Sequence, residues 1–304
     1  MDKMQRLPYN PLTRAAFQSQ EPHSLAVVGH LAIDTILHPN FEIESSPGGS
    51  AAAIATASVQ FGIYTSIHSK VGKDLPKEWL TVLENLGVDI SNLEFSDKKE
   101  SLKVKFEYNE KGGLENLECN DRLLTGLKIK SLPRTECVHI CPAQPQDQAE
   151  LVKNLKGVGR KVSISFSDYF IDDYKKKDFL STIKWNDIDL VFLNEAEAKA
   201  ISKEKSPEDM ARKFHDEGAK VVAITLGKKG SLVYDGKGMH SINARDVEVV
   251  DPTGCGDSYI GGFLGEYLVS KDIQKAAGMG TYLASLTAQK KGSWAALLSD
   301  VGRF

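Results

Sequence analysis

The residue types best suited to chemistry in this chain stand together in the segment 251–257, DPTGCGD, ahead of an apolar, helix-compatible run at 258–269. Two glycines around one small residue allow a sharp turn that presents backbone N–H groups at a helix N-terminus, where anions bind. A carboxylate at Asp257 would lie in the first helical turn and could take the proton of an attacking hydroxyl. The segment therefore predicts a base beside an anion site. Alternatively, Gly254 and Gly256 form a plain turn and Asp257 caps the helix.

Short apolar runs recur along the chain and predict strands that are buried on both faces. Helical patterns lie between these runs, and several of them end at a glycine. This alternation predicts an α/β fold with a mostly parallel central sheet flanked by helices. The predicted strands are 25–28, 138–140, 162–166, 190–193 and 221–224, and the predicted helices are 51–61, 76–86, 146–155, 194–201 and 207–215.

One stretch departs from this rhythm. Residues 102–106 and 114–118 alternate apolar with polar side chains, and the turn-rich sequence NEKGG joins them. The pattern predicts a hairpin in a sheet with one wet face. Together with residues 35–43 it would form a small β-sheet lid, with lid segments at about 34–46 and 95–120. A plain surface hairpin is the alternative.

Composition places the chain among ordinary globular proteins. A hydrophobic content of 41%, a charged content of 26% and a net charge of −3 give no indication of nucleic-acid or anionic-membrane binding. No apolar run approaches the roughly 20 residues that cross a bilayer, and the N-terminal segment lacks the apolar region of a signal peptide, so a cytoplasmic protein is expected. Residues 1–23 show no sustained periodicity, and we expect an N-terminal extension there, followed by one domain at 24–304.

The four cysteines are too few and too irregularly spaced for a disulfide framework in a chain of this length. Cys137, His139 and Cys141 alternate, which could suggest a metal site. Alternating residues share one face of a strand, however, and no second ligand cluster with zinc spacing occurs elsewhere in the sequence. A buried strand is therefore the favoured interpretation.

The segment 251–265, DPTGCGDSYIGGFLG, resembles the C-terminal signature of the ribokinase-like, or PfkB, carbohydrate kinases, whose usual form is D-T-x-G-A-G-D. Pro252 is a common variant in that family, whereas Cys255 stands where Ala or Ser is usual. The resemblance runs from about residue 24 to the C-terminus and implies a ribokinase-like fold. It also implies that Asp257 is the catalytic base, with phosphoryl-binding amides at Gly254, Cys255 and Gly256.

Two further motifs resemble the substrate-binding elements of this family. The sequence GHLAID looks like the family's first strand with its acidic residue, Asp34, whose carboxylate would accept hydrogen bonds from neighbouring substrate hydroxyls. A lone aspartate after a strand would otherwise indicate a turn or cap. The sequence PGGSAAA resembles the di-glycine substrate motif, with Gly48 and Gly49. Ala53 stands where many sugar-specific relatives carry Asn, which weakens a prediction of ribose or fructose as substrate.

Two other motifs resemble the nucleotide-binding elements. The sequence NEAE matches the family's N-x-x-E element, with Asn194 and Glu197 at the signature positions. The resemblance implies that this glutamate organises Mg²⁺ near the phosphates, although the bare tetrapeptide is also a common helix start. The sequence TLGKKG resembles the nucleotide-binding loop, in which Thr225 and Gly227 would bind ATP.

These elements are expected to converge on one crevice, because Asp34, Asn194, Thr225 and Asp257 each follow soon after a predicted strand, and open α/β sheets bind ligands beyond the carboxyl ends of their strands. The resemblance implies an ATP- and Mg²⁺-dependent kinase that phosphorylates a hydroxyl of a sugar, nucleoside or cyclitol. One alternative is a catalytically inactive ligand-binding protein of the same fold, which the intact Asp257 disfavours. Another is a dehydrogenase, which the missing dinucleotide loop disfavours. Family members are often dimers through the lid, which leaves a homodimer open here.

Overall fold

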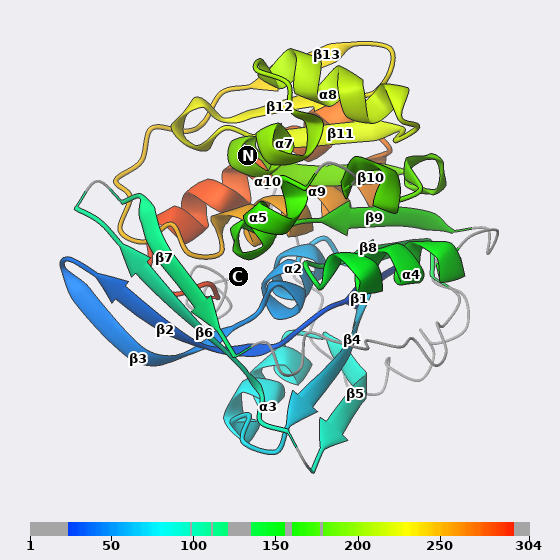
Figure 1. The fold of residues 1–304 in the computed structure, drawn as a ribbon. Helices are drawn as coiled ribbons and strands as arrows, with labels where there is room; N and C mark the ends of the chain where they lie inside the picture. The colour runs from blue at the N-terminus through cyan, green and yellow to red at the C-terminus, as the bar shows by residue number, and fades with distance from the viewer. Residues whose placement is uncertain are drawn as a thin grey trace, which may run out of the picture.

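The computed structural model describes residues 24–97, 99–110, 112–120, 135–155, 160–176 and 179–294. The predicted extension at 1–23 lies outside the described residues. Figure 1 shows a large sheet with helices on both faces and a second, smaller sheet beside it. Among the helices described, none has the length and apolar character that a membrane span requires.

The large sheet has nine described strands in the order β13-β12-β11-β10-β9-β8-β1-β4-β5. The strands from β11 to β5 in this order run parallel to one another. At one edge, β12 pairs antiparallel with β11, and β13 pairs antiparallel with β12. The bounds are β1 (Ser24–Val28), β4 (Tyr64–Gly72), β5 (Asp89–Ser96), β8 (Cys137–Ile140), β9 (Lys161–Ser165), β10 (Leu190–Asn194), β11 (Val221–Thr225), β12 (Ser231–Tyr234) and β13 (Met239–Ile242).

Helices cover both faces of this sheet and form two hydrophobic cores. One core contains side chains of α4 to α8, and the other contains side chains of α2, α3, α9 and α10. Successive residues of the central strands point into opposite cores, which explains why these strands are continuous apolar runs. The helices are α2 (Ser50–Val59), α3 (Lys77–Asn85), α4 (Pro145–Leu155), α5 (Ile171–Tyr174), α6 (Phe179–Thr182), α7 (Glu195–Ser202), α8 (Pro207–Asp216), α9 (Cys255–Ser270) and α10 (Ile273–Ala288), with 3-10 turns η3 (Asp168–Phe170), η4 (Trp185–Asp187) and η5 (Gly227–Lys229).

The predicted α/β class is confirmed, and each predicted buried strand is present as β1, β8, β9, β10 or β11. The predicted helices occur as α2, α3, α4, α7 and α8, with each end within two residues of its predicted position. Four strands of the large sheet and helix α10 were not predicted. Strand β4 shows why, because its buried positions carry Thr65, Ser66, His68 and Ser69 rather than an apolar run.

The smaller sheet contains four described strands in the order β3-β2-β6-β7. Strand β2 pairs in parallel with β6, and the two hairpins β2–β3 and β6–β7 are antiparallel. The predicted hairpin is therefore part of a separate sheet, joined by the earlier segment as the sequence indicated. The strands are β2 (Ala32–His38), β3 (Phe41–Gly48), β6 (Leu102–Tyr108) and β7 (Leu114–Cys119).

The alternating Cys137, His139 and Cys141 belong to buried strand β8 and the residue after it. The ring nitrogens of His139 are hydrogen bonded to the hydroxyls of Ser163 (2.9 Å) and Ser165 (3.1 Å) on the neighbouring strand β9. Across the described residues, no group of three or more His, Cys, Asp or Glu side chains could hold a metal ion. The interpretation of this segment as a strand is confirmed for the described part of the chain.

Candidate active site

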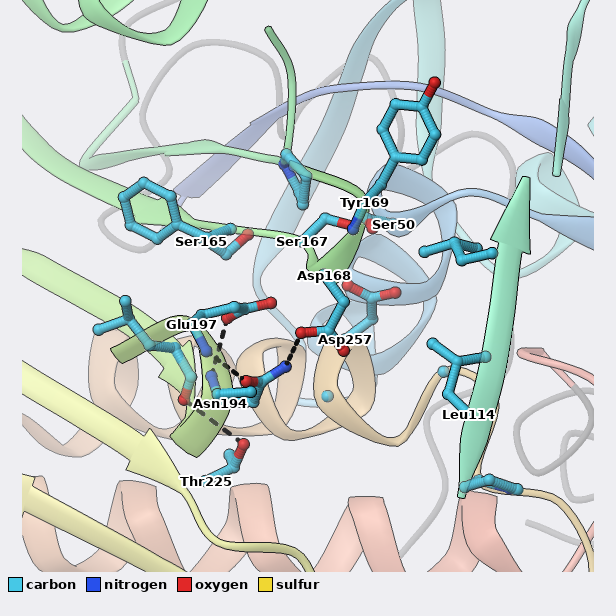
Figure 2. A pocket seen from close by; sticks show the side chains of 18 of the residues that line it. Ser50, Leu114, Ser165, Ser167, Asp168, Tyr169, Asn194, Glu197, Thr225 and Asp257 are labelled. Atoms are coloured by element: carbon cyan, nitrogen blue, oxygen red, sulfur yellow. Dashed lines mark hydrogen bonds between the residues drawn. The ribbon is translucent and has the colours of Figure 1, made fainter. Parts of the chain in front are cut away.

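A pocket of about 870 Å³ lies between the carboxyl ends of the large-sheet strands, the smaller sheet and the N-terminus of α9. Figure 2 shows Asn194, Glu197 and Thr225 on one side of this pocket and Leu114 of the smaller sheet on the other. The pocket brings together side chains that are more than 220 positions apart in the sequence. Nine of the predicted site residues line it: Asp34, Gly49, Asn194, Glu197, Thr225, Gly227, Gly254, Gly256 and Asp257.

Asp257 is the third residue of α9, whose N-cap is Gly254. Gly254 has a positive φ of 78°, and a Cβ there would approach Ser293 Cα to 2.7 Å, so this position requires glycine. Burial raises the pKa of Asp257 to about 6, while a hydrogen bond with the Ser50 hydroxyl lowers it. A carboxylate in this environment is mostly deprotonated at neutral pH and is a stronger base than an ordinary aspartate.

The N–H groups at the start of α9 are not equivalent. The Cys255 N–H donates to the Pro252 carbonyl (3.2 Å), which differs from the expectation that it would bind the phosphoryl group. Among the described residues, no acceptor is found for the N–H groups of Gly254 and Gly256. Gly256 is exposed, and a Cβ there would meet no atom within 4 Å. Two open donors at a helix N-terminus can bind an anion.

Asp251, the first residue of the signature segment, organises the loop before α9. Its carboxylate is fully buried and accepts hydrogen bonds from the N–H groups of Thr253 (2.8 Å) and Gly292 (2.8 Å). These bonds hold the turn that leads into Gly254 against the segment after α10. Asp251 was not assigned a role from the sequence, because its partner lies 41 positions away.

Asp34 lies in β2 and is only 2% exposed. Burial, followed by the charges of Asp257 and Asp251, raises the pKa of Asp34 well above its usual range. Its Oδ1 atom has no hydrogen-bond partner among the described residues. An unpaired buried acceptor is costly to maintain and is typical of a ligand-binding group, since a ligand hydroxyl would satisfy it.

The two glycines of the predicted substrate motif make room for neighbouring protein groups. A Cβ on Gly48 would lie about 2.0 Å from the Asp34 carboxylate, and Gly48 itself does not line the pocket. Gly49 has a φ of 91° and is the N-cap of α2, and a Cβ there would lie 2.3 Å from the His30 carbonyl oxygen. Ala53 is fully buried in α2 and does not line the pocket.

Asn194 and Glu197 form a capping box at the start of α7. The Asn194 side chain accepts from the Glu197 N–H (2.8 Å), and the Glu197 carboxylate accepts from the Asn194 N–H (2.8 Å). The Asn194 amide also donates to Asp168 Oδ1 (3.0 Å), as the dashed lines in Figure 2 show. The tetrapeptide is therefore both a helix start and a part of the pocket wall.

Glu197 and Asp168 place two carboxyl groups in this wall. Burial is the main cause that raises the pKa of Glu197 to about 8, with contributions from Asp168 and Asp257, while the Asn194 N–H lowers it. Mg²⁺ usually takes one or two protein carboxylates and completes its shell with water and phosphate oxygens. The pair fits such an ion. Asp168 was missed by sequence reasoning, although its position just after β9 follows the same strand-end rule that found Asn194.

Thr225 and Gly227 follow β11 at the same end of the pocket. The Thr225 hydroxyl donates to the Leu193 carbonyl (3.4 Å), a long hydrogen bond that leaves its oxygen able to accept. Gly227 has a φ of 57°, and a Cβ there would meet nothing within 4 Å. The loop therefore presents small groups to the pocket.

The smaller sheet contributes an apolar wall. Alternate residues of β6 and three residues of β7 face the pocket, as expected for a strand period of two, while the charged Lys105 and Glu107 form an ion pair on the other face. The predicted wet face is therefore present. The wall consists of Leu102, Val104, Phe106, Tyr108, Leu114, Leu117 and Cys119.

The sequence model of the pfkB family carbohydrate kinases matches residues 22–299. This chain belongs to that family, which makes it a kinase of the carbohydrate and nucleoside class.

Relatives within this class include a cytidine kinase of Thermococcus kodakarensis, which is 34% identical over 279 residues that cover 89% of this chain and 98% of the relative. A crystal structure of the nucleoside kinase of Methanocaldococcus jannaschii is similar with a TM-score of 0.74 and 25% identity, covering 93% of this chain and 99% of that one. The fold is also similar to a Vibrio cholerae fructokinase solved with fructose, ADP and calcium, with a TM-score of 0.75 and 22% identity over 90% and 96% of the two chains.

Proposed function

We propose that this chain transfers the γ-phosphoryl group of ATP to a hydroxyl group of a nucleoside, with Asp257 as the catalytic base. The observation that supports this most strongly is the juxtaposition of the half-buried Asp257 carboxylate with two open N–H donors at the N-terminus of α9, inside one pocket that Asp34 also lines. Transfer to an alcohol needs a base for the hydroxyl proton and donors for the phosphoryl oxygens.

In the proposed reaction the acceptor oxygen forms a bond to the γ-phosphorus as the bond between that phosphorus and ADP breaks. Asp257 takes the proton of the acceptor hydroxyl. The N–H groups of Gly254 and Gly256, with the dipole of α9, stabilise the charge on the transferring group. Asp34 orients the acceptor through its unpaired oxygen.

The nucleotide is expected at the end of the pocket formed by Asn194, Thr225 and Gly227. Mg²⁺, when bound, neutralises phosphate charge, and the carboxyl groups of Glu197 and Asp168 would hold it. The raised pKa of Glu197 is consistent with a group that awaits a cation, since a nearby positive charge would favour its deprotonated form.

The apolar wall of the smaller sheet favours a nucleoside over a simple sugar or cyclitol. A sugar carries hydroxyls around most of its ring, and these would lose hydrogen bonds against Val104, Phe106 and Leu117. A nucleobase has flat apolar faces that pack well against such side chains, while its ribose offers hydroxyls to Asp34. The cytidine and nucleoside kinases among the relatives support the same choice.

The smaller sheet is expected to act as a lid that limits the loss of ATP to water. Within the described part of the chain, β3 and β7 are the edge strands of this sheet, and an edge strand can pair with a second copy, so a homodimer through the lid stays a prediction. We expect the reaction to take place in the cytoplasm.

The test is an ADP-release assay with Mg²⁺-ATP over nucleosides, pentoses, hexoses and cyclitols. Nucleosides are expected to give the highest kcat/KM, with pyrimidine and purine nucleosides compared at equal concentration. A higher kcat/KM for a free sugar would contradict the nucleoside assignment and leave the kinase assignment in place. The absence of ADP release with every acceptor would favour the catalytically inactive ligand-binding protein.

A further inference from the structure

Tyr108 lies at the junction between the smaller sheet and the loop before α9. It is the last residue of β6 and lines the pocket as part of the apolar wall. Its hydroxyl oxygen is 2.9 Å from the Thr253 hydroxyl, 145 positions further along the chain. One side chain therefore borders the acceptor pocket and is hydrogen bonded to the signature segment.

Both partners of this hydrogen bond are well fixed. The Tyr108 ring lies nearly parallel to that of Phe106, with ring centroids 6.4 Å apart and an interplanar angle of 8°. The ring of His38, on the neighbouring strand β2, lies 6.2 Å from that of Tyr108. Thr253 is 4% exposed, and its N–H donates to the buried Asp251 carboxylate (2.8 Å). Thr253 is thus fixed by two hydrogen bonds, one from its backbone N–H to Asp251 and one between its hydroxyl and that of Tyr108.

Thr253 immediately precedes Gly254, the N-cap whose positive φ sets the direction of α9. A shift of Thr253 would move the open N–H groups of Gly254 and Gly256 relative to the acceptor. A misplacement of about 1 Å in such a site can cost roughly 100-fold in rate. The hydroxyl pair links the surface that faces the acceptor to the donors that would face the phosphoryl group.

We propose, building on the function proposed above, that Tyr108 is a positioning residue whose hydroxyl holds Thr253 and thereby aligns the donors at the N-terminus of α9 with an acceptor bound against the smaller sheet. In this proposal the Tyr108 ring contacts the acceptor, and the hydroxyl fixes Thr253. Removal of the hydroxyl alone should therefore leave acceptor binding in place and slow the transfer step.

The test compares Tyr108→Phe, Thr253→Val and Thr253→Ser with wild type, on whichever acceptor the wild type phosphorylates best. Tyr108→Phe and Thr253→Val should each lower kcat roughly 10- to 100-fold, with the acceptor KM changed less than about threefold. Thr253→Ser keeps the hydroxyl and should restore most of the lost turnover. The double variant Tyr108→Phe/Thr253→Val should be no slower than either single variant, because both remove the same hydrogen bond.

Two controls separate this inference from a loss of folding and from a failure of the proposed function. Tyr234→Phe makes the same change on β12, outside the pocket lining, and should leave kcat unchanged. Amide hydrogen exchange of residues 252–257, measured without substrates, should be faster in Tyr108→Phe than in wild type. That measurement needs no activity, so it tests the hydrogen bond even if nucleosides are not the substrate.

Several results would overturn the inference. The hydroxyl does not position the loop if Tyr108→Phe has the kcat of wild type, or if the variant changes only the acceptor KM. The same conclusion follows if the fold-losses in kcat of the two single variants multiply in the double variant. Unchanged exchange at residues 252–257 would do the same. Preference for a sugar over nucleosides would contradict only the proposed acceptor.

Discussion

The two ends of the pocket differ in how completely their polar groups are bonded. At the proposed nucleotide end, Asn194 forms hydrogen bonds of 2.8 to 3.0 Å with Glu197 and Asp168. At the acceptor end, Asp34 Oδ1 and both ring nitrogens of His30 are buried without a partner among the described residues. The proposed nucleotide end is preorganised by its own side chains, whereas the proposed acceptor end has buried polar atoms that a ligand could satisfy. Specificity should therefore be decided mainly at the acceptor end.

The largest effect is expected where the two ends meet, at Asp257. Asp257→Asn removes the base and keeps the side-chain shape, so kcat should fall roughly 10²- to 10⁴-fold, while the affinity for ADP changes little. Steady-state kinetics and calorimetry measure the two quantities. Near-normal turnover of this variant would remove Asp257 from the role of base.

At the acceptor end, Asp34→Asn should lower kcat/KM for the acceptor about 100-fold, because charged hydrogen bonds to the substrate are lost. The KM for ATP should stay within about twofold. The variant should also unfold at the same temperature as wild type or higher, because it replaces a carboxyl group whose ionised form is disfavoured by burial with a neutral amide. A lower unfolding temperature with unchanged acceptor kinetics would show that Asp34 is structural.

The dependence of kcat/KM on pH reports the protonation state of the carboxyl groups of Asp257 and Asp34 in the free enzyme. Since Asp257 must be deprotonated to act as a base and its pKa is about 6, kcat/KM should rise about tenfold per pH unit below 6 and level off above 7. The raised pKa of Asp34 acts in the same direction, because the protonated acid accepts fewer hydrogen bonds. ADP affinity over the same range serves as a control. A flat kcat/KM between pH 5 and 7 would contradict both assignments.

The smallest effect is expected at the nucleotide end. Asn194→Ala removes the α7 cap and the hydrogen bond to Asp168, and should lower the free energy of unfolding by about 1–2 kcal/mol. Thermal or denaturant unfolding measures this change. Ser206→Ala, which removes the cap of α8 outside the pocket lining, is the matched control for stability. If Asn194→Ala leaves stability unchanged, the contrast between the two ends of the pocket does not hold.

The sequence was informative wherever local pattern and motif agree. The continuous apolar runs predicted the central strands because both faces of the sheet are covered, and the glycines around Cys255 marked the turn that carries Asp257 into the pocket. Motif position also found Asp34 and Glu197, whose raised pKa values depend on burial that a sequence does not show directly.

The residues that were missed depend on contacts distant in sequence. Tyr108 reads as an ordinary strand residue, and only the fold brings it to Thr253. Strand β4 was missed because several of its buried positions carry polar residues, some of which are hydrogen bonded within the fold, as Ser66 is with His68 (3.2 Å) and Thr65 with Ser58 (3.2 Å). No hydrophobic period signals such a strand.

Phosphorus-31 NMR of wild-type protein mixed with Mg²⁺-ATP and cytidine tests most directly whether this chain transfers a phosphoryl group to the hydroxyl of a nucleoside. We expect the γ-phosphate signal to be replaced by that of a phosphomonoester on the nucleoside, with an equal amount of ADP. A γ-phosphate that stays on ATP, or that appears only as inorganic phosphate across a panel of nucleosides, would contradict the proposed nucleoside kinase activity.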